Sequence, residues 1–149
     1  MADHPSIVII GTADTKADEI LFMKECIEQA GAKAAIMDVG ILNKPAFRPD
    51  YSNDDVASSA GTTIPDIIAL GEESLAMAKM SEGAANLTRQ LQEAGKIDGM
   101  IALGGTMGTD LALDVANILP LGFPKFIVST IASSHPLPPE RLAPDVMMI

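Results

Sequence analysis

The chain has 149 residues, of which 48% are hydrophobic and 20% charged, a composition typical of a globular domain and not of a disordered segment. Twenty acidic residues against ten basic ones give a formal net charge of −10, which argues against a general nucleic-acid binder or a protein that docks on anionic membranes. Aromatic residues make up only 3%, so base stacking on aromatic platforms is not expected either.

Cysteine usage and the opening residues indicate the compartment. The single cysteine, Cys26, cannot form an internal disulfide, which fits a reducing environment. We interpret it as a small core residue of a helix. Residues 1–5 lack the basic region of a signal peptide, and no apolar run reaches the roughly 18 residues of a membrane helix. We therefore expect a cytoplasmic protein.

The first part of the chain predicts a β-α-β unit. Ser6–Ile10 is an apolar, β-branched run typical of a strand buried on both faces. Apolar residues recur at helical spacing over 20–30, Gly31 provides a stop, and a second strand is expected over 33–39. The crossover between two such parallel strands is right-handed by the usual rule.

The middle of the chain predicts a long loop over 40–52 and then helices. Asn53 is expected to cap the first of these helices, and Gly95 to end the last. The predicted helices cover residues 54–60, 64–70 and 72–94.

The last third predicts more strands and one helix. Strands are expected over 97–103, 125–131 and 145–149, with a helix over 109–119 that Pro120 ends. The alternation of strands and helices predicts an α/β fold, a Rossmann-like three-layer open sheet that is mostly parallel and has about five strands. Because the sequence ends on an apolar strand, we expect residues 1–149 to be one domain cut from a longer protein.

Three glycines and two hydroxyl side chains mark the turn between the strand over 97–103 and the helix that follows. Such a turn can bind an anion, because the first N–H groups of a helix lack internal partners and glycine lets a phosphate approach the backbone. The turn is neither a Walker loop nor a full G-x-G-x-x-G, so a plain tight turn remains the alternative. The candidate residues are Gly104, Gly105, Thr106, Gly108 and Thr109.

Two other post-strand turns, over 11–16 and 129–135, have a similar character. Ligands of open parallel sheets bind beyond the carboxyl ends of the strands, where the strand order reverses. If the order begins 2-1-3, the turns over 11–16 and 104–109 face each other; if it runs 3-2-1-4, the turns over 11–16 and 129–135 do. The first turn takes part either way, so we expect the turns to converge on one site.

Three charged residues follow the first two strands. Lys16 could reach a phosphate or could be a solvated lysine. Asp14 could bind a metal–phosphate or a ribose, or could cap the helix. Asp38 lies where dinucleotide folds hold ribose hydroxyls, although a turn or capping role is the alternative.

Catalytic and metal sites have weaker signals. Asp110 and Asp114, four residues apart, could share a helix face and hold a metal, but the helix dipole also favours Asp110. His135 could act as an acid or base, or could simply be exposed. No Ser-His-Asp arrangement, zinc spacing or nucleophile elbow is present. We therefore assign no catalytic residue and no metal ligand.

Four segments together resemble a known family: Gly11-Thr12-Ala13-Asp14-Thr15-Lys16, Met37-Asp38-Val39-Gly40, Gly104-Gly105-Thr106-Met107-Gly108-Thr109 and Pro124-Lys125-Phe126-Ile127-Val128-Ser129-Thr130. They resemble the little-characterised family that includes the ATP-binding inhibitory domain of the tomato mosaic virus resistance protein and has many bacterial and fungal members. The likeness runs from about Ile7 to Ile149, and the first segment is its most specific part.

The resemblance implies a Rossmann-like domain that binds ATP, with Mg²⁺, and forms a homodimer, followed in the same chain by a C-terminal domain. The positions that match the family pattern and are implied to bind the nucleotide are Gly11, Thr12, Asp14, Thr15, Lys16, Gly104, Gly105, Thr106, Gly108, Thr109, Ser129 and Thr130.

The chain departs from the family pattern in two turns. Relatives tend to have a Gly-Ser-Gly-Gly-like turn where this chain has Thr106-Met107, which fills space near the expected phosphates. The third turn continues as Ser134-His135-Pro136 instead of with glycine and an acidic residue. ATP binding is the leading hypothesis. The alternatives are an enzyme acting on a small phosphate or carboxylate in a cleft shared with the C-terminal domain, and a dimerising interaction module.

Overall fold

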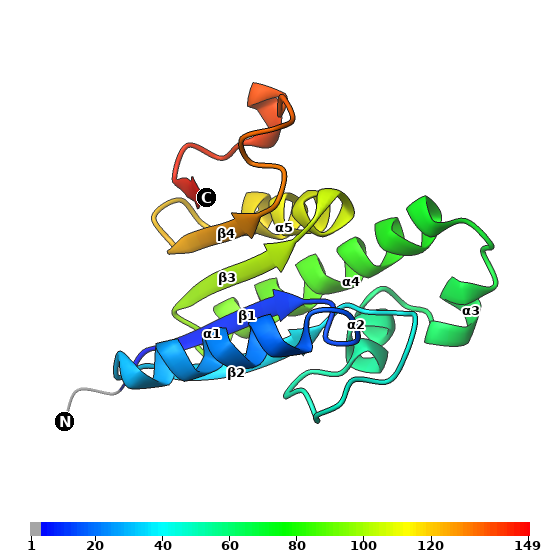
Figure 1. The fold of residues 1–149 in the computed structure, drawn as a ribbon, viewed down its shortest axis with the longest axis horizontal. Helices are drawn as coiled ribbons and strands as arrows, with labels where there is room; N and C mark the ends of the chain where they lie inside the picture. Colours follow the sequence, from blue (N-terminus) through cyan, green and yellow to red (C-terminus); the bar gives the residue numbers. More distant parts are fainter. Residues whose placement is uncertain (1–3) are drawn as a thin grey trace.

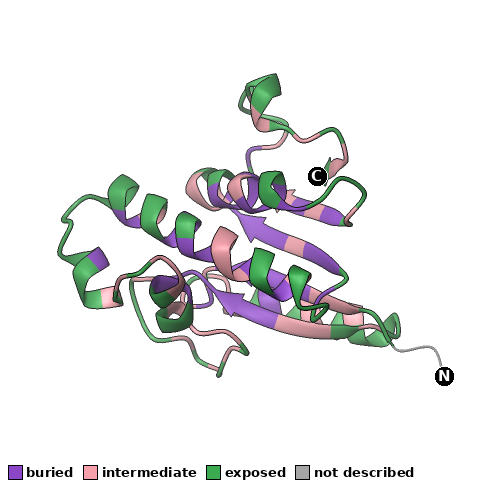
Figure 2. Cartoon of the chain, turned by 180° about the vertical axis from the view of Figure 1, so that it is seen from behind, coloured by how far each residue is buried: buried purple, intermediate pink, exposed green. Residues whose placement is uncertain are grey.

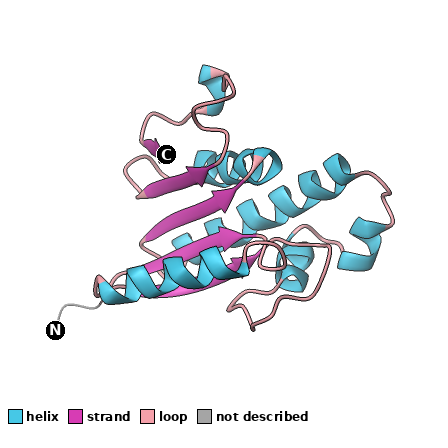
Figure 3. Ribbon diagram, viewed as in Figure 1, coloured by secondary structure: helices cyan, strands magenta, loops and turns pink. Residues whose placement is uncertain are grey.

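The computed structural model describes residues 4–149; residues 1–3, on which part of the signal-peptide argument rests, lie outside the described range. Strands alternate with helices along the chain, as Figure 3 shows. The elements in chain order are β1 (Ser6–Gly11), α1 (Ala17–Gln29), β2 (Lys33–Asp38), α2 (Asn53–Ser59), α3 (Ile64–Ile68), α4 (Glu73–Glu93), β3 (Gly99–Gly104), α5 (Thr106–Ile118), β4 (Lys125–Ser129), the 3₁₀ helix η1 (Pro139–Arg141) and β5 (Val146–Met148).

The five strands form one sheet in the order β2-β1-β3-β4-β5. Every pairing is parallel, and β1 pairs with β2 on one side and with the central strand β3 on the other. Helix α1 lies on one face, over β1 and β2, while α4 and α5 lie on the opposite face (Figure 1). The predicted three-layer α/β fold is therefore confirmed, with strand order 2-1-3.

Side chains of successive strand residues alternate between the two faces of the sheet and build two cores. Val8 and Met100 belong to the larger core, beneath α4 and α5. Ile9 and Ile36 belong to the smaller core, beneath α1. Figure 2 shows that burial is most complete in β1 and β3, whereas β4 and β5 are largely intermediate. β1 has helices over both faces, which explains why residues 6–10 form a continuous apolar run.

Several predicted boundaries differ from the structure. The helix expected to begin at residue 109 begins at Thr106, because Thr109 N already donates to Gly105 O at 2.8 Å. The strand expected over 125–131 ends at Ser129. Ser52, not Asn53, caps α2, because its hydroxyl accepts from Asp55 N. Asn53 is the first residue of that helix.

Three further findings concern the helices. Cys26 is exposed on α1, so its interpretation as a core residue was wrong: the apolar face of that helix is formed by residues such as Ile20, Met23 and Ile27. Gly83 lies where α4 crosses α2, and a Cβ there would come within 2.0 Å of Val56 O. Over residues 4–149, none of the helices combines the length and the hydropathy needed to cross a membrane.

Candidate functional site

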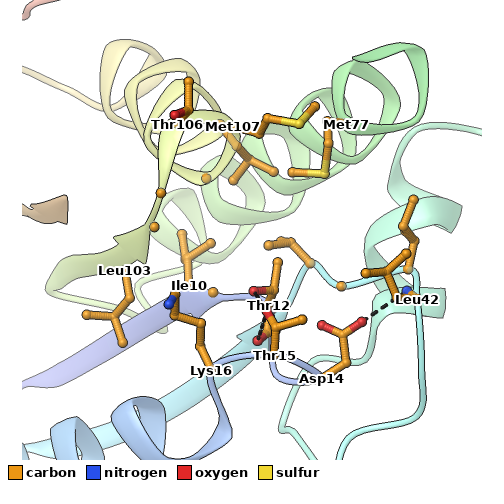
Figure 4. A pocket seen from close by; sticks show the side chains of 18 of the residues that line it. Ile10, Thr12, Asp14, Thr15, Lys16, Leu42, Met77, Leu103, Thr106 and Met107 are labelled. Carbon is orange, nitrogen blue, oxygen red and sulfur yellow. Dashed lines mark hydrogen bonds between the residues drawn. The ribbon is translucent and has the colours of Figure 1, made fainter. Parts of the chain in front are cut away.

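A cavity of about 310 Å³ opens at the carboxyl ends of β1 and β3. The connection from β1 leads to β2 on one side, whereas the connection from β3 leads to β4 on the other, so this is the point where the strand order reverses. The turn over 11–16 and the turn over 104–108 line opposite sides of the cavity (Figure 4). The structure therefore brings two of the three predicted turns together at the position where open α/β sheets bind ligands.

The first turn is closed by its own backbone. Thr15 N and Lys16 N both donate to Thr12 O, at 3.1 and 2.8 Å, and the hydroxyls of Thr12 and Thr15 are hydrogen-bonded to each other. Helix α1 then begins at Ala17 without a side-chain cap. Lys16 lines the cavity and has only a 3.9 Å contact to Glu19, with about a third of its side chain exposed. Its ammonium group is thus only loosely held by the protein.

The glycines of the second turn have two different reasons to be glycine. A Cβ at Gly104 would lie 2.5 Å from the carbonyl carbon of Gly108, so close packing alone requires that glycine. At Gly105 and Gly108 the nearest atoms to a Cβ would lie 3.7 and 3.6 Å away, which is ordinary contact. These two positions leave bare backbone at the start of α5, which has no side-chain cap.

The rest of the cavity wall is mostly apolar, and part of it comes from elements that the sequence analysis did not assign to the site. The loop after β2 and helix α4 contribute, and Met107 faces Met77 across one side (Figure 4). Gly40 had a signal, since it belongs to a segment that carries the family resemblance. The residues of α4 had no local signal, because only the tertiary fold brings them here. The additional lining residues are Ile10, Val39, Gly40, Ile41, Leu42, Glu73, Met77, Leu103, Met107 and Leu111.

Asp14 joins the first turn to the loop after β2. Its Oδ2 accepts hydrogen bonds from Leu42 N at 3.0 Å and Asn43 N at 3.1 Å. Its Oδ1 is buried and has no partner among the described residues. A Cβ at Gly40 would lie 2.4 Å from Oδ1, so the carboxylate rests directly on the glycine backbone. Asp14 therefore shapes one wall of the cavity and does not cap α1.

Asp38 makes a second connection between the same two loops. Only 1% of this residue is exposed, and its Oδ1 accepts from Ala13 N at 2.9 Å and Gly40 N at 2.8 Å. Burial raises the pKa of the carboxyl group, partly offset by these two hydrogen bonds. Because Asp38 does not line the cavity, the geometry favours its interpretation as a turn residue over the ribose-binding one.

The third predicted turn stands apart from the cavity. The hydroxyl of Thr109 is buried and hydrogen-bonded to the Ser129 hydroxyl at 2.6 Å, and Thr130 N donates to Gly104 O at 3.1 Å. These contacts fix the second turn from behind. Thr109, Ser129 and Thr130 therefore support the site and do not line it.

The two aspartates of α5 are engaged by an arginine. Arg141 donates to Asp114 Oδ1 at 2.6 Å and to Asp110 Oδ1 at 2.9 Å, which ties η1 to α5. His135 is exposed, and its Nδ1 lies 3.1 Å from the Ser134 hydroxyl. Within residues 4–149, no three His, Cys, Asp or Glu side chains come together as a metal site.

Comparison with known proteins assigns the family. The family described as "Uncharacterised protein family (UPF0261) N-terminal domain" matches residues 5–149. A UPF0261 protein of Brucella suis is 62% identical over 147 residues, which cover 99% of this chain and 35% of that protein. A UPF0261 protein of Clostridium tetani is 37% identical over 135 residues, 91% of this chain and 33% of that protein.

A plant protein is also similar. The ToMV resistance protein Tm-1(GCR237) of Solanum lycopersicum is 31% identical over 156 residues, which cover 90% of this chain and 20% of that protein. The chain spans about a third of the length of the bacterial relatives that it matches. By this match and these identities, the chain belongs to the uncharacterised protein family UPF0261 and corresponds to its N-terminal domain.

Proposed function

We propose that this domain binds a nucleoside triphosphate, ATP being the one that the family resemblance implies, with the phosphates against the turns over 11–16 and 104–108. The observation that carries the proposal is the cavity between these turns. Two helices begin at its edge without side-chain caps, so their first N–H groups are available to an anion. Gly105 and Gly108, which packing does not require, let phosphate oxygens approach the backbone.

The charges that line the cavity favour a metal-bound nucleotide over a free one. Lys16 is the single basic side chain of the lining, beside the acidic Asp14 and Glu73. A bare triphosphate would meet more negative than positive charge here, and Mg²⁺ bound to the phosphates removes that repulsion. Magnesium in such sites usually takes one or two carboxylates and completes its shell with phosphates and water. The partnerless Oδ1 of Asp14 is the protein oxygen that fits this role.

The apolar wall accounts for the other end of the ligand. Ile41, Leu42 and Met77 line the side of the cavity formed by the β2–α2 loop and α4. Aliphatic and thioether side chains can enclose a nucleobase through dispersion contacts without aromatic stacking. We therefore assign the base to this side and the phosphates to the two turns.

The test is isothermal titration calorimetry of the full-length protein with ATP and Mg²⁺. We expect binding by the wild type and an affinity lower by about 10- to 100-fold in Lys16→Ala, since a hydrogen bond to a charged group contributes about 1.5–3 kcal/mol. The matched control is Lys33→Ala, an exposed lysine at the start of β2, where no change is expected. Absence of binding, or equal affinity of the Lys16 variant and the wild type, would refute the proposal.

A pair of glycine variants separates binding from folding. Gly108→Ala adds a methyl group with only ordinary contacts, so we expect normal thermal stability and weakened nucleotide binding. Gly104→Ala forces backbone apart inside the turn and is expected to lower stability itself. Unchanged affinity in the Gly108 variant would show that bare backbone at the start of α5 is not used by the ligand.

A further inference from the structure

One face of the sheet is covered over only part of its width. Helix α1 packs on β1 and β2, and among residues 4–149 no other helix lies on this face, as Figure 1 shows for the side of β3 and β4 turned toward the viewer. We define the open face as the α1-side surface of β3, β4 and β5, formed by Ile101, Leu103, Phe126, Val128 and Met147. Parallel sheets are normally covered on both faces.

The open face is apolar and hollowed along the flank of α1. One groove of about 320 Å³ lies between Phe22 of α1 and Val128 of β4. A second groove of about 370 Å³ lies between Ile27 and Phe126 and reaches Met147 of β5. Phe22 and Met147 are 66% and 63% exposed. A contiguous apolar surface of this kind, in an otherwise strongly acidic chain, indicates a site where another element packs.

Among the described residues that line the two grooves, charged ones lie only at the two ends of the open face. Lys16 and Glu19 lie at the end nearest the cavity. Lys125 and Asp145 lie at the other end, where they pair with each other. Between these ends the groove walls are apolar, so the element that fits them has an apolar stripe flanked by polar residues, as an amphipathic helix does.

The length of the relatives indicates where such a helix comes from. This chain matches an N-terminal domain and about a third of the length of its bacterial relatives, so most of such a protein follows the part described here. At Ile149 the backbone is still hydrogen-bonded to β4, through Ile149 N to Ile127 O at 3.0 Å and Ser129 N to Ile149 O at 2.7 Å. Chain that follows residue 149 therefore starts at the edge of the open face.

The handedness of the fold determines which face a later connection crosses. The connection from β1 to β2 runs toward the β2 edge of the sheet and places α1 on the same side as the open face. The connections from β2 to β3 and from β3 to β4 run toward the β5 edge and place α4 and α5 on the opposite side. A right-handed connection from β5 to a strand beyond β2 passes over the open face, whereas one to a strand added beside β5 passes over the opposite face. We propose that a helix from the segment following residue 149 in the full-length protein packs on the open face, beside α1.

Photo-crosslinking in the full-length protein tests the proposal. A benzophenone amino acid is placed at Phe22, and unlabelled and ¹⁵N-labelled copies are expressed separately, unfolded together in denaturant and refolded as a mixture before irradiation. We expect a crosslink to a peptide beyond residue 149 that carries the same isotope label as Phe22. Mixed-label crosslinks would mean that a second copy covers the face, and the absence of any protein crosslink would mean that the face is free; either result overturns the proposal. The matched control site is Ile68 on α3, which is 55% exposed and away from the open face.

Thiol labelling provides a second measurement that does not depend on nucleotide binding. Met147→Cys and Ile68→Cys place thiols at two positions of similar exposure in this domain. In the full-length protein, with labelling followed peptide by peptide, we expect the thiol at 147 to react at least roughly tenfold more slowly, because a packed helix must open first. Equal rates would overturn the proposal and leave the nucleotide site unaffected.

Discussion

Replacing Asp38 tests whether its carboxylate holds the two loops that form one side of the cavity. Asp38→Ala removes the acceptor of two hydrogen bonds, from Ala13 N and Gly40 N, and both donors belong to buried residues. A buried donor left without a partner costs about 1–3 kcal/mol. Two donors cost about 2–6 kcal/mol, and relief of the buried carboxylate offsets part of this, so we expect a net loss of about 2–4 kcal/mol.

The matched variant is Asp38→Asn, which keeps an oxygen at the Oδ1 position. Its amide nitrogen replaces Oδ2, an atom that already has no partner among the described residues, so we expect a stability within about 1 kcal/mol of the wild type. In a domain of this size 1 kcal/mol shifts the thermal midpoint by about 2–4 °C, and differential scanning calorimetry resolves the two variants. Equal losses in both, or a wild-type midpoint in Asp38→Ala, would refute the role of the two hydrogen bonds.

Three further outcomes are expected. Burial raises the Asp38 pKa above its ordinary 3.8, so the folded state binds the proton more tightly and the free energy of unfolding falls as pH rises through the raised pKa. In urea titrations from pH 4 to 7, the stability of Asp38→Asn should therefore rise relative to that of the wild type. A relative loss of stability would contradict this. The hydrogen bond from Lys125 lowers the pKa of Asp145, so the contribution of this carboxylate to stability is present above pH 3.8 and is lost as pH falls through the lowered pKa. The stability of Asp145→Asn should therefore fall less steeply with acid than that of the wild type. An unchanged acid titration would exclude this linkage. Gly83→Ala should lower the free energy of unfolding by about 1–3 kcal/mol through overpacking, despite the roughly 1 kcal/mol gain in helix propensity. The control is Glu82→Ala at an exposed position, which should change the stability measured by calorimetry by less than about 0.5 kcal/mol. A higher thermal midpoint for the Gly83 variant would refute the α2–α4 contact.

The fold could be predicted from the sequence because its strands are apolar runs, most clearly in β1, which is buried on both faces. Runs such as Ser6–Ile10 have no polar alternation, and the glycines at 31 and 95 end helices with positive φ values of 86° and 67°. What failed were the ends of elements. Helix α5 starts at Thr106 because Thr109 N already makes a helical hydrogen bond to Gly105 O. The pattern of side chains gives no sign of this backbone hydrogen bond.

The candidate site could be predicted only in part. The turns over 11–16 and 104–108 stand out by their glycines and hydroxyls, and the strand order then brings them together. Ser129 could not be separated from them by sequence, since its hydroxyl has the same character but bonds to Thr109 behind the turn. Met77 is on α4 and lines the cavity only because that helix packs beside it in the folded domain. The residues around Met77 in the sequence could not predict this position.

β1, an interior strand of the sheet, is made early in translation, but one of its two neighbours comes late. β1 and β2 form a unit within the first 38 residues, whereas β3, which pairs with the other edge of β1, begins at Gly99. A nascent chain on the ribosome therefore carries an apolar strand with an unsatisfied backbone edge until β3 has been synthesised. Such an edge is a template for wrong pairing between chains, which makes residues 6–11 the segment where a chaperone would be most needed during synthesis.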